Sequence, residues 1–224
     1  MSTKLYNMLK NMRKDEILKR SNFLCEHGHN GLSHPQCYQV SMNGPERVGI
    51  LDIECSGLKA DFGLILSYHF RDLNNQCCGR ALTTAEIRSK TKDMRLIQDC
   101  INDMKKYDRL VTYYGTKFDI PFIRTKATHY KLDFPSFGEL THTDLYFIVK
   151  HKFKLHRNSL QAACDFFDIP SKGSRLNSEI WTEALVGDKK ALDYVFKHNM
   201  EDTDSTLKLF NKIYNYTRIK NTSI

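Results

Sequence analysis

Acidic residues in three distant parts of the sequence have the types and spacing that metal-dependent chemistry requires. Asp52 and Glu54 stand two positions apart at the end of the apolar run 48–53. Successive side chains of a strand point to opposite faces, so both carboxylates share one face of the predicted strand. Neighbouring acids repel each other unless a cation lies between them, and carboxylate oxygens suit Mg²⁺ or Mn²⁺. The alternative is a strand that ends in acids because it reaches solvent.

The second acid, Asp119, lies between a strand that is predicted to end at Gly115 and an apolar stretch that contains Pro121. An aspartate just before a helix is most often its N-cap, and a proline early in the helix fits that interpretation. One carboxylate oxygen can cap the helix while the other binds a metal. The two roles are therefore compatible.

The third acid, Asp202, lies in a long helix predicted from about residue 188 to 216. Seven residues at spacings of three and four form one stripe of this helix: Ala191, Val195, His198, Asp202, Thr206, Leu209 and Ile213. An acid on a packed face needs a partner or a metal. His198 is one turn earlier on the same face, whereas Asp204 lies about 200° further round and points away. Alternatively, His198 and Asp202 satisfy each other beneath the sheet.

Three segments together resemble the exonuclease motifs of the DEDD superfamily, the ribonuclease H-like 3′→5′ exonucleases that include polymerase proofreading domains. They are Leu51-Asp52-Ile53-Glu54-Cys55-Ser56-Gly57, the Tyr-x-Gly-x-x-Phe-Asp-x-Pro-Phe pattern at 113–122, and Asp202 followed by Thr206 and Leu209. They occur in the family's order and spacing over roughly residues 46–215. His142-Thr143-Asp144-Leu145 and Asn158-Ser159-Leu160-Gln161 resemble intermediate segments of the branch with stand-alone and family B proofreading members.

The resemblance implies that two divalent ions, Mg²⁺ or Mn²⁺, are held by four carboxylates: Asp52, Glu54, Asp119 and Asp202. It also implies a general base one turn before the last aspartate. The tyrosine branch has Tyr there with three residues between, and the histidine branch has His with four. This sequence combines His198 with the three-residue spacing. A second departure is Tyr114, where the family often has Asn, and it concerns substrate contacts more than metal binding.

Hydrophobic patterning predicts the elements that must position these residues. Strands are expected at 48–53, 64–70 and 110–114, with a weaker one near 78–82, and helices at 93–107, 119–130, 144–151, 158–167, 178–186 and 188–216. Strands mostly precede helices, with a strand–helix–strand unit in the middle. This order indicates an α/β fold with a mixed sheet flanked by helices, as the resemblance to ribonuclease H-like proteins also implies.

The charge of the chain favours a polyanionic partner. Its 224 residues include 34 Lys and Arg against 26 Asp and Glu, a net charge of +8. Segment 150–157 contains four cations and no acid: Lys150, Lys152, Lys154 and Arg157. With Phe153 it is predicted to grip a nucleic-acid strand by charge and stacking. The alternative is a solvated loop between helices.

Several classes of protein are excluded by composition. No run approaches eighteen apolar residues, so we expect no membrane span. The N-terminus lacks the apolar core of a signal peptide, and we expect an intracellular protein, cytoplasmic or in the nucleoid or nucleus. The seven cysteines are odd in number and irregularly spread, which favours reduced thiols or metal ligands over a disulfide framework.

A Cys/His cluster near the N-terminus predicts a second metal site. Cys25, His27, His29, His34 and Cys37 place five such residues within thirteen positions. We expect a closed structural zinc site made by Cys25, His34 and Cys37 with either His27 or His29. The alternative is a His-rich loop. The predicted organisation is a basic helical arm at 1–22, this Cys/His-rich segment at 23–45 and the exonuclease domain at 46–224.

The sequence thus predicts a metal-dependent 3′→5′ exonuclease that hydrolyses phosphodiester bonds at single-stranded ends, DNA more than RNA. His198 would act as general base or orient the attacking water. Two alternatives stay open: a catalytically inactive nucleic-acid-binding module of the same fold, which would not require four converging acids, and a structure-specific endonuclease, which would cut closed circles. The sequence identifies no replication or repair partner.

Overall fold

The computed structural model describes residues 12–25, 28–136, 138–170, 173–216 and 222–223. The chain divides into two compact units, Met1–Glu46 and Arg47–Ile224. Within the part of the chain that the structure describes, no helix is long and apolar enough to cross a membrane.

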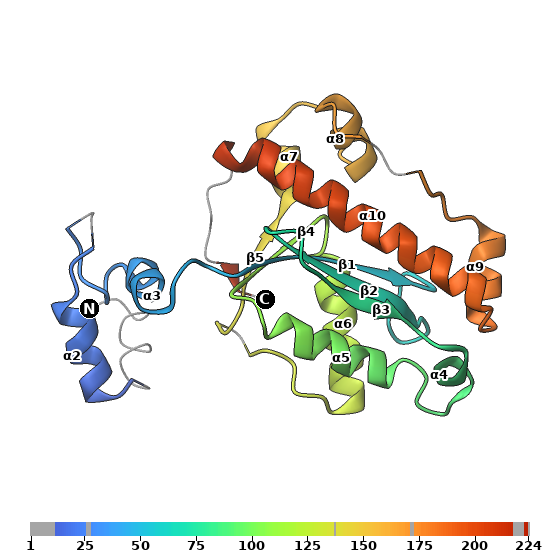
Figure 1. Ribbon diagram of the computed structural model, residues 1–224, viewed down its shortest axis with the longest axis horizontal. Helices are drawn as coiled ribbons and strands as arrows, with labels where there is room; N and C mark the ends of the chain where they lie inside the picture. The colour runs from blue at the N-terminus through green and yellow to red at the C-terminus, as the bar shows by residue number, and fades with distance from the viewer. Residues whose placement is uncertain (1–11, 26–27, 137, 171–172, 217–221, 224) are drawn as a thin grey trace. The chain divides into compact units, whose positions relative to one another are not determined.

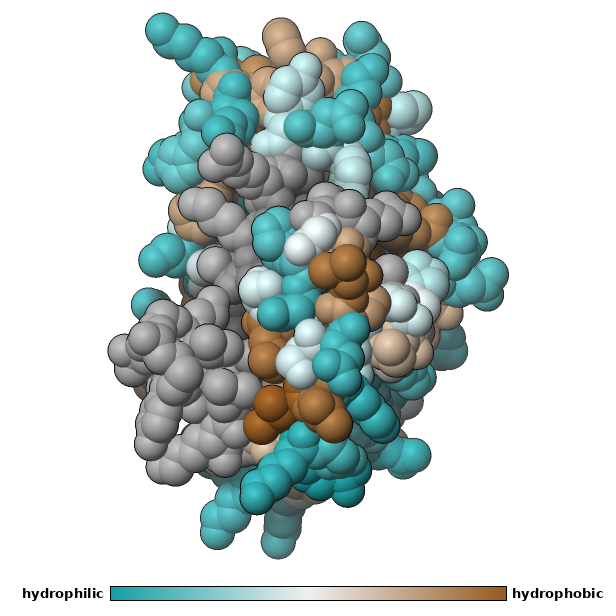
Figure 2. All heavy atoms as spheres, turned by 90° about the vertical axis from the view of Figure 1, so that its left-hand side faces the viewer, coloured by the Kyte–Doolittle hydropathy of each residue, from teal (hydrophilic) through white to brown (hydrophobic). Residues whose placement is uncertain are grey.

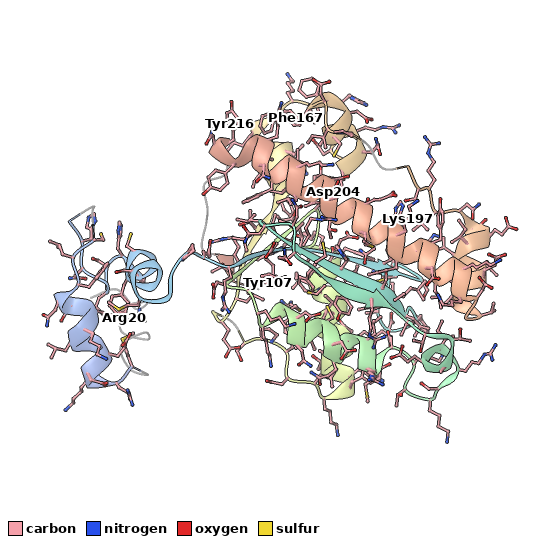
Figure 3. The ribbon with its side chains drawn as sticks, in the orientation of Figure 1. Arg20, Tyr107, Phe167, Lys197, Asp204 and Tyr216 are labelled. Atoms are coloured by element: carbon pink, nitrogen blue, oxygen red, sulfur yellow. The ribbon has the colours of Figure 1, made fainter. Side chains whose placement is uncertain are left out.

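The described part of the N-terminal unit contains two short helices. Helix α2 (Lys14–Asn22) covers the second half of the predicted basic arm, and residues 1–11 lie outside the described residues. An isolated bridge pairs Leu24 with Asn30 before α3 (Pro35–Asn43) begins. The rings of Tyr38 in α3 and Phe23 are nearly perpendicular, with centroids 5.3 Å apart. The guanidinium of Arg20, labelled in Figure 3, lies 4.8 Å from the Tyr38 ring centre.

The larger unit contains a mixed six-stranded sheet in the order β3-β2-β1-β4-β5-β6. The strands are β1 (Val48–Cys55), β2 (Ile65–Asp72), β3 (Cys77–Ala81), β4 (Arg109–Thr112), β5 (Thr141–Asp144) and β6 (Thr222–Ser223). Strands β1 to β3 form an antiparallel meander, β4 and β5 continue from β1 in parallel, and β6 pairs antiparallel with β5. The predicted mixed sheet is therefore present.

Helices cover both faces of this sheet (Figure 1). The long helix α10 (Lys189–Ile213) contacts β1 and β2 on one face, and α5 (Met94–Met104) and α6 (Asp119–Tyr130) lie on the other. The other helical segments that the structure describes in this unit are α4 (Thr84–Arg88), α7 (Leu145–Lys152), α8 (Leu160–Phe166), α9 (Ser178–Leu185) and the 3-10 turn Tyr214–Tyr216.

The alternation of β1 decides which of its side chains meet which helices. Leu51 and Ile53 join the hydrophobic core with α5 and α6. Val48 and Ile50 join a second core with residues of α7, α8 and the C-terminal half of α10. Because the side-chain period of a strand is two, residues 52 and 54 lie on the same face as residues 48 and 50.

Strand β5 was not predicted, and its sequence explains why. Thr141-His142-Thr143-Asp144 lacks the apolar residues that usually mark a buried strand. Its side chains are nevertheless largely buried, because neighbouring β4 supplies polar partners. Thr112 Oγ1 lies 2.9 Å from His142 Nε2, and Arg109 Nη1 donates to Thr143 Oγ1 at 3.0 Å. The predicted strand 110–114 also ends earlier, at Thr112, because Tyr114 has a left-handed backbone with φ of +69°.

Candidate active site

The two acids of β1 share one face of the sheet, as the strand pattern predicted, and this face is covered by α10. Nδ2 of Asn199, a fully buried residue of α10, donates to Oδ2 of Asp52 at 2.5 Å. Oδ1 of the same amide accepts from Ser67 Oγ on β2 at 3.2 Å. Asn199 therefore fixes the Asp52 carboxylate against the sheet, with both ends of its amide in use.

Asp119 reaches the same place from α6. It is the first residue of that helix rather than its N-cap, which is Phe118, so the capping alternative is wrong. Its Oδ1 instead accepts the backbone N–H of Ile53 at 3.1 Å. Since Ile53 lies between Asp52 and Glu54, this bond holds the Asp119 carboxylate beside the two acids of β1.

The loop before α6 is held by a buried aspartate of β5. Asp144 accepts the backbone N–H of Tyr114 at 2.8 Å and that of Thr116 at 2.9 Å. It also caps α7 by accepting the N–H of Tyr146 at 3.0 Å. Asp144 thus connects the segment that carries Asp119 to the neighbouring helix.

Helix α10 brings His198 and Asp202 to the acids of β1. His198 Nε2 lies 3.8 Å from Glu54 Oε1 and 3.9 Å from Asp202 Oδ2. The predicted stripe is the packed face of the helix, and all of its members except the partly exposed Asp202 are buried. At 3.9 Å the imidazole is too far from Asp202 for a direct hydrogen bond. Asp204 instead pairs with Lys208 at 2.6 Å and lies 4.0 Å from Arg71 (Figure 3).

The other ring nitrogen of His198 is held by a buried serine. Ser174 Oγ lies 2.9 Å from His198 Nδ1 and donates its single proton to Glu201 Oε2, which also accepts the Ser174 backbone N–H at 3.1 Å. Burial raises the pKa of Glu201, but the bonds from Ser174 and the charge of Lys197 outweigh it, so the net pKa is lowered. An ionised Glu201 accepts only, so Nδ1 of His198 must be the donor to Ser174. In the neutral imidazole the lone pair is then on Nε2, which faces Glu54 and Asp202.

Two of the carboxylates, Asp52 and Asp119, have a raised pKa. Burial, followed by the charges of Asp119, Asp202 and Glu54, raises the pKa of Asp52 well above its usual value, and the bond from Asn199 only partly opposes this. Burial raises the pKa of Asp119 to about 7, with bonds from backbone N–H groups acting against it and the charges of Asp144 and Asp202 adding to it. Both acids therefore resist ionisation unless positive charge is brought to the site.

The donors at this site suit hard divalent cations. Glu54 and Asp202 each offer a carboxylate oxygen within 4.8 Å of the other and of a ring nitrogen of His198. The charge of Asp202 raises the pKa of both Asp52 and Asp119, so these two acids belong to the same cluster. A set of carboxylate oxygens is one that Mg²⁺ or Mn²⁺ accepts, and the imidazole of His198 lies beside it. The residues present therefore fit the metal ions implied by the family resemblance.

The segment predicted to bind a nucleic-acid strand, residues 150–157, is partly helix and partly loop. Lys150 and Lys152 lie in the last turn of α7, and Lys154 and Arg157 follow in the loop, all four exposed. A groove of about 510 Å³ adjoins this segment and is lined by Arg157 with Tyr113, Tyr114, Tyr146, Asn158, Ser159 and Leu160. The rings of Tyr114 and Tyr146 meet edge to face at 4.7 Å, and Lys150 Nζ lies 5.8 Å from the Tyr146 ring centre. Arg157 and Lys150 are thus associated with a tyrosine-lined groove next to the loop that leads to Asp119.

Sequence reasoning missed three residues that orient the site: Asn199, Ser174 and Glu201. Asn199 and Glu201 lie between His198 and Asp202, and this polar run within a packed helix was an available signal. Ser174 lies in a segment without periodic patterning, so only the folded chain brings it to His198.

Comparison with known proteins agrees with this geometry. A sequence model of the RNase H superfamily matches residues 50–214. The chain belongs to this superfamily. No protein of curated function matches the sequence significantly. Membership of the superfamily confirms the predicted ribonuclease H-like α/β fold and, with the acidic cluster, supports nuclease activity.

A solved structure with a similar fold is the family B DNA polymerase from the hyperthermophilic archaeon Pyrobaculum calidifontis. The TM-score is 0.62 at 18% sequence identity, and the match covers 76% of this chain. It spans 25% of the polymerase. At this identity the similarity concerns the fold alone.

Proposed function

We propose that the protein is a metal-dependent 3′→5′ exonuclease of the DEDD type. Its substrates would be single-stranded nucleic-acid ends, DNA in preference to RNA. The observation that carries the proposal is the convergence of four acids from three separate segments: Asp119, Asp202 and Glu54 all act on the pKa of Asp52, and Glu54 and Asp202 lie 3.8 and 3.9 Å from His198 Nε2. A binding module would gain nothing from a cluster of four acids, because acids repel the phosphates of a nucleic acid.

The four carboxylates would hold two Mg²⁺ or Mn²⁺ ions. When bound, two such ions activate a water and stabilise the attacking and leaving oxygens of a phosphodiester. The chain's own contribution is to fix the ligands before substrate arrives. Asn199 holds Asp52, and the backbone of Ile53 holds Asp119, so little reorganisation is needed at the moment of reaction.

His198 is proposed as the general base, or as the group that orients the attacking water. Its Nε2 faces Glu54 and Asp202, and its Nδ1 bonds to Ser174. A neutral imidazole with its lone pair on Nε2 is suited to take a proton from the attacking water near neutral pH. The hydroxyl of Ser174 would stabilise the protonated ring by accepting the Nδ1–H bond throughout.

The groove lined by Tyr114, Tyr146 and Arg157 is proposed to bind the end of the strand. Tyrosine rings provide stacking surfaces for bases without sequence preference, and Arg157 and Lys150 supply phosphate contacts. Stacking on tyrosines requires unpaired bases, which favours single-stranded substrates over duplexes.

The experiment that tests this function uses purified full-length protein and single-stranded DNA and RNA oligonucleotides. We expect shortening with Mg²⁺ or Mn²⁺, none with EDTA, and none with the Asp52→Asn variant. Asp204→Asn is the matched control, because Asp204 lies on the same helix as Asp202 but pairs with Lys208. A closed single-stranded circle should stay intact, whereas cutting of the circle would favour the endonuclease alternative. Strand binding without shortening under any metal would favour an inactive module.

A further inference from the structure

The N-terminal unit contains a second cluster of metal-ligating side chains, with a chemistry unlike that of the carboxylate site. Cys25 Sγ lies 3.6 Å from His34 Nδ1, and Cys37 Sγ lies 3.7 Å from the same nitrogen. The ligand atoms of all three residues lie within 4.8 Å of one another. Sulfur and nitrogen donors of this kind select zinc rather than Mg²⁺.

The local backbone brings these three residues together. The N–H of Cys25 donates to the carbonyl of His29 at 3.0 Å, and the N–H of Gly28 donates to the carbonyl of Cys25 at 2.8 Å. Gly28 has a φ of +75°, which a glycine adopts without strain. The resulting turn points back to α3, where His34 directly precedes the helix and Cys37 lies in its first turn. The positive end of a helix dipole favours a thiolate at that position.

The sulfur–nitrogen distances match those of a tetrahedral zinc site. With zinc–sulfur bonds of about 2.3 Å and zinc–nitrogen bonds of about 2.0–2.1 Å at the tetrahedral angle, the two donor atoms lie about 3.6 Å apart. Thiol-to-imidazole hydrogen bonds are the competing explanation. One ring nitrogen makes one linear hydrogen bond, whether it accepts with its lone pair or donates its single proton. Hydrogen bonding therefore accounts for one contact, whereas a shared zinc ion accounts for both.

The described part of the N-terminal unit has a very small hydrophobic core. Among its described side chains, Cys25 and Tyr38 are the buried hydrophobic ones. On the face of the molecule that Figure 2 presents, hydrophobic side chains form small patches among hydrophilic ones. Small units without a sufficient core depend on disulfides or metals, and metal binding then supplies folding free energy directly.

We infer that Cys25, His34 and Cys37 bind a structural zinc ion, the cysteines as thiolates and His34 through Nδ1, and that a histidine of the preceding turn completes the site. The ring centre of His29 lies 4.2 Å from that of His34, but its nitrogens do not lie within 4.8 Å of all three ligand atoms, so binding through His29 requires its side chain to turn. His27 lies outside the described residues. The zinc site is independent of the proposed nuclease function, since its ligands come from a different unit of the chain.

Metal analysis of the full-length protein tests the site without any measurement of activity. After purification under reducing conditions and dialysis against a mild chelator, we expect about one zinc per chain. Cys37→Ser should lose it, whereas Cys77→Ser, which removes an exposed thiol of β3, should retain it. Wild-type protein that stays zinc-free after reduction and zinc addition, or equal zinc content in Cys37→Ser and wild type, would overturn the proposal.

Cobalt substitution provides a spectroscopic readout of the ligand type, with the circular dichroism of each variant as the control for folding. Tetrahedral Co²⁺ with thiolate ligands absorbs intensely, whereas Co²⁺ in an oxygen-rich site absorbs weakly. The intense bands should appear in wild type and in Asp202→Asn, and should be absent from Cys25→Ser. One of His27→Gln and His29→Gln should weaken cobalt binding and the other leave it unchanged. Intense bands that persist without Cys25 and Cys37, or that neither histidine affects, would contradict the site.

Discussion

The hydroxyl of Ser174 lies 2.9 Å from Nδ1 of His198 and donates its proton to Glu201. This relationship fixes the tautomer of an imidazole whose other nitrogen faces two acids. A residue that acts on another in this way positions it rather than taking part in the reaction, and such contacts are commonly worth 10- to 100-fold in activity at metal sites.

Ser174→Ala should therefore lower kcat by roughly tenfold or more while leaving the KM for the oligonucleotide nearly unchanged. Ser174→Thr keeps the hydroxyl and should recover most of the loss. Steady-state kinetics of the three proteins decides the matter. A Thr variant as slow as the Ala variant would show that Ser174 acts by packing alone.

His198 and Asp202 should differ in what their removal does. His198→Ala should cut turnover by about 10²- to 10⁴-fold and leave metal and strand binding largely intact. Asp202→Asn should instead weaken metal binding, because it removes a ligand charge. Mn²⁺ titration calorimetry beside single-turnover rates separates the two effects. Wild-type turnover in His198→Ala would remove this residue from the mechanism.

In the absence of metal, Asp119 is expected to destabilise the fold at alkaline pH. Its pKa in the folded protein, about 7, exceeds the ordinary aspartate value of 3.8. The contribution of Asp119 to the free energy of unfolding is therefore most favourable at low pH and is lost as the pH rises through 7. In EDTA at pH 8, Asp119→Asn should raise the free energy of unfolding by about 1–3 kcal/mol, because the amide still accepts the Ile53 N–H. With Mn²⁺ bound, the wild type should instead have the larger free energy of unfolding, because the variant lacks a ligand charge. Urea denaturation of both proteins with and without metal measures this.

His142 should make stability depend on pH in the opposite direction. Burial, aided by Arg109 and opposed by Asp144, lowers its pKa from 6.5 to about 4. A depressed pKa contributes stability above pH 6.5 that is lost as pH falls from 6.5 towards 4. His142→Gln keeps a polar partner for Thr112 but cannot titrate. At pH 7 the free energy of unfolding of His142→Gln, measured by urea denaturation, should be lower than that of the wild type. At pH 4.5 the gap between the two free energies should be smaller by about 1–3 kcal/mol. A difference that is independent of pH would contradict the burial of a neutral imidazole.

The tyrosine-lined groove predicts two distinct binding phenotypes. Tyr146→Ala should weaken single-strand binding by about 1–3 kcal/mol with an unchanged salt dependence. Arg157→Ala should lower the slope of log K against log salt by about one phosphate contact. Fluorescence anisotropy in EDTA measures both, with Lys189→Ala as control because Lys189 pairs with Asp193 in the first turn of α10. Equal losses in the control would argue for non-specific attraction.

Local patterns in the sequence were sufficient wherever the chain follows a regular period. The alternation of β1 predicted that Asp52 and Glu54 share a face, and the stripe of α10 predicted that His198 and Asp202 lie together on its packed side. Strand β5 could not be predicted from its own sequence, because its polar side chains are buried through hydrogen bonds to the neighbouring strand. The bond between Thr112 and His142 is one of them, and it is a tertiary contact without a local sequence pattern. The role of Ser174 could not be predicted for the same reason. Local sequence made helix capping an alternative for Asp119, because its hydrogen-bond partner, the Ile53 N–H, is 66 residues away in the sequence.

The polarity of cleavage tests the central claim most directly. A single-stranded DNA oligonucleotide is labelled at its 5′ end in one reaction and at its 3′ end in another, and both are incubated with the full-length protein and Mg²⁺ or Mn²⁺. We predict that the 5′-labelled strand gives a ladder of progressively shorter products and that the 3′ label is released at once as a mononucleotide, with neither result in EDTA. Release of the 5′ label first, or intact strands under every metal condition, would contradict the assignment of the four-carboxylate site to 3′→5′ hydrolysis.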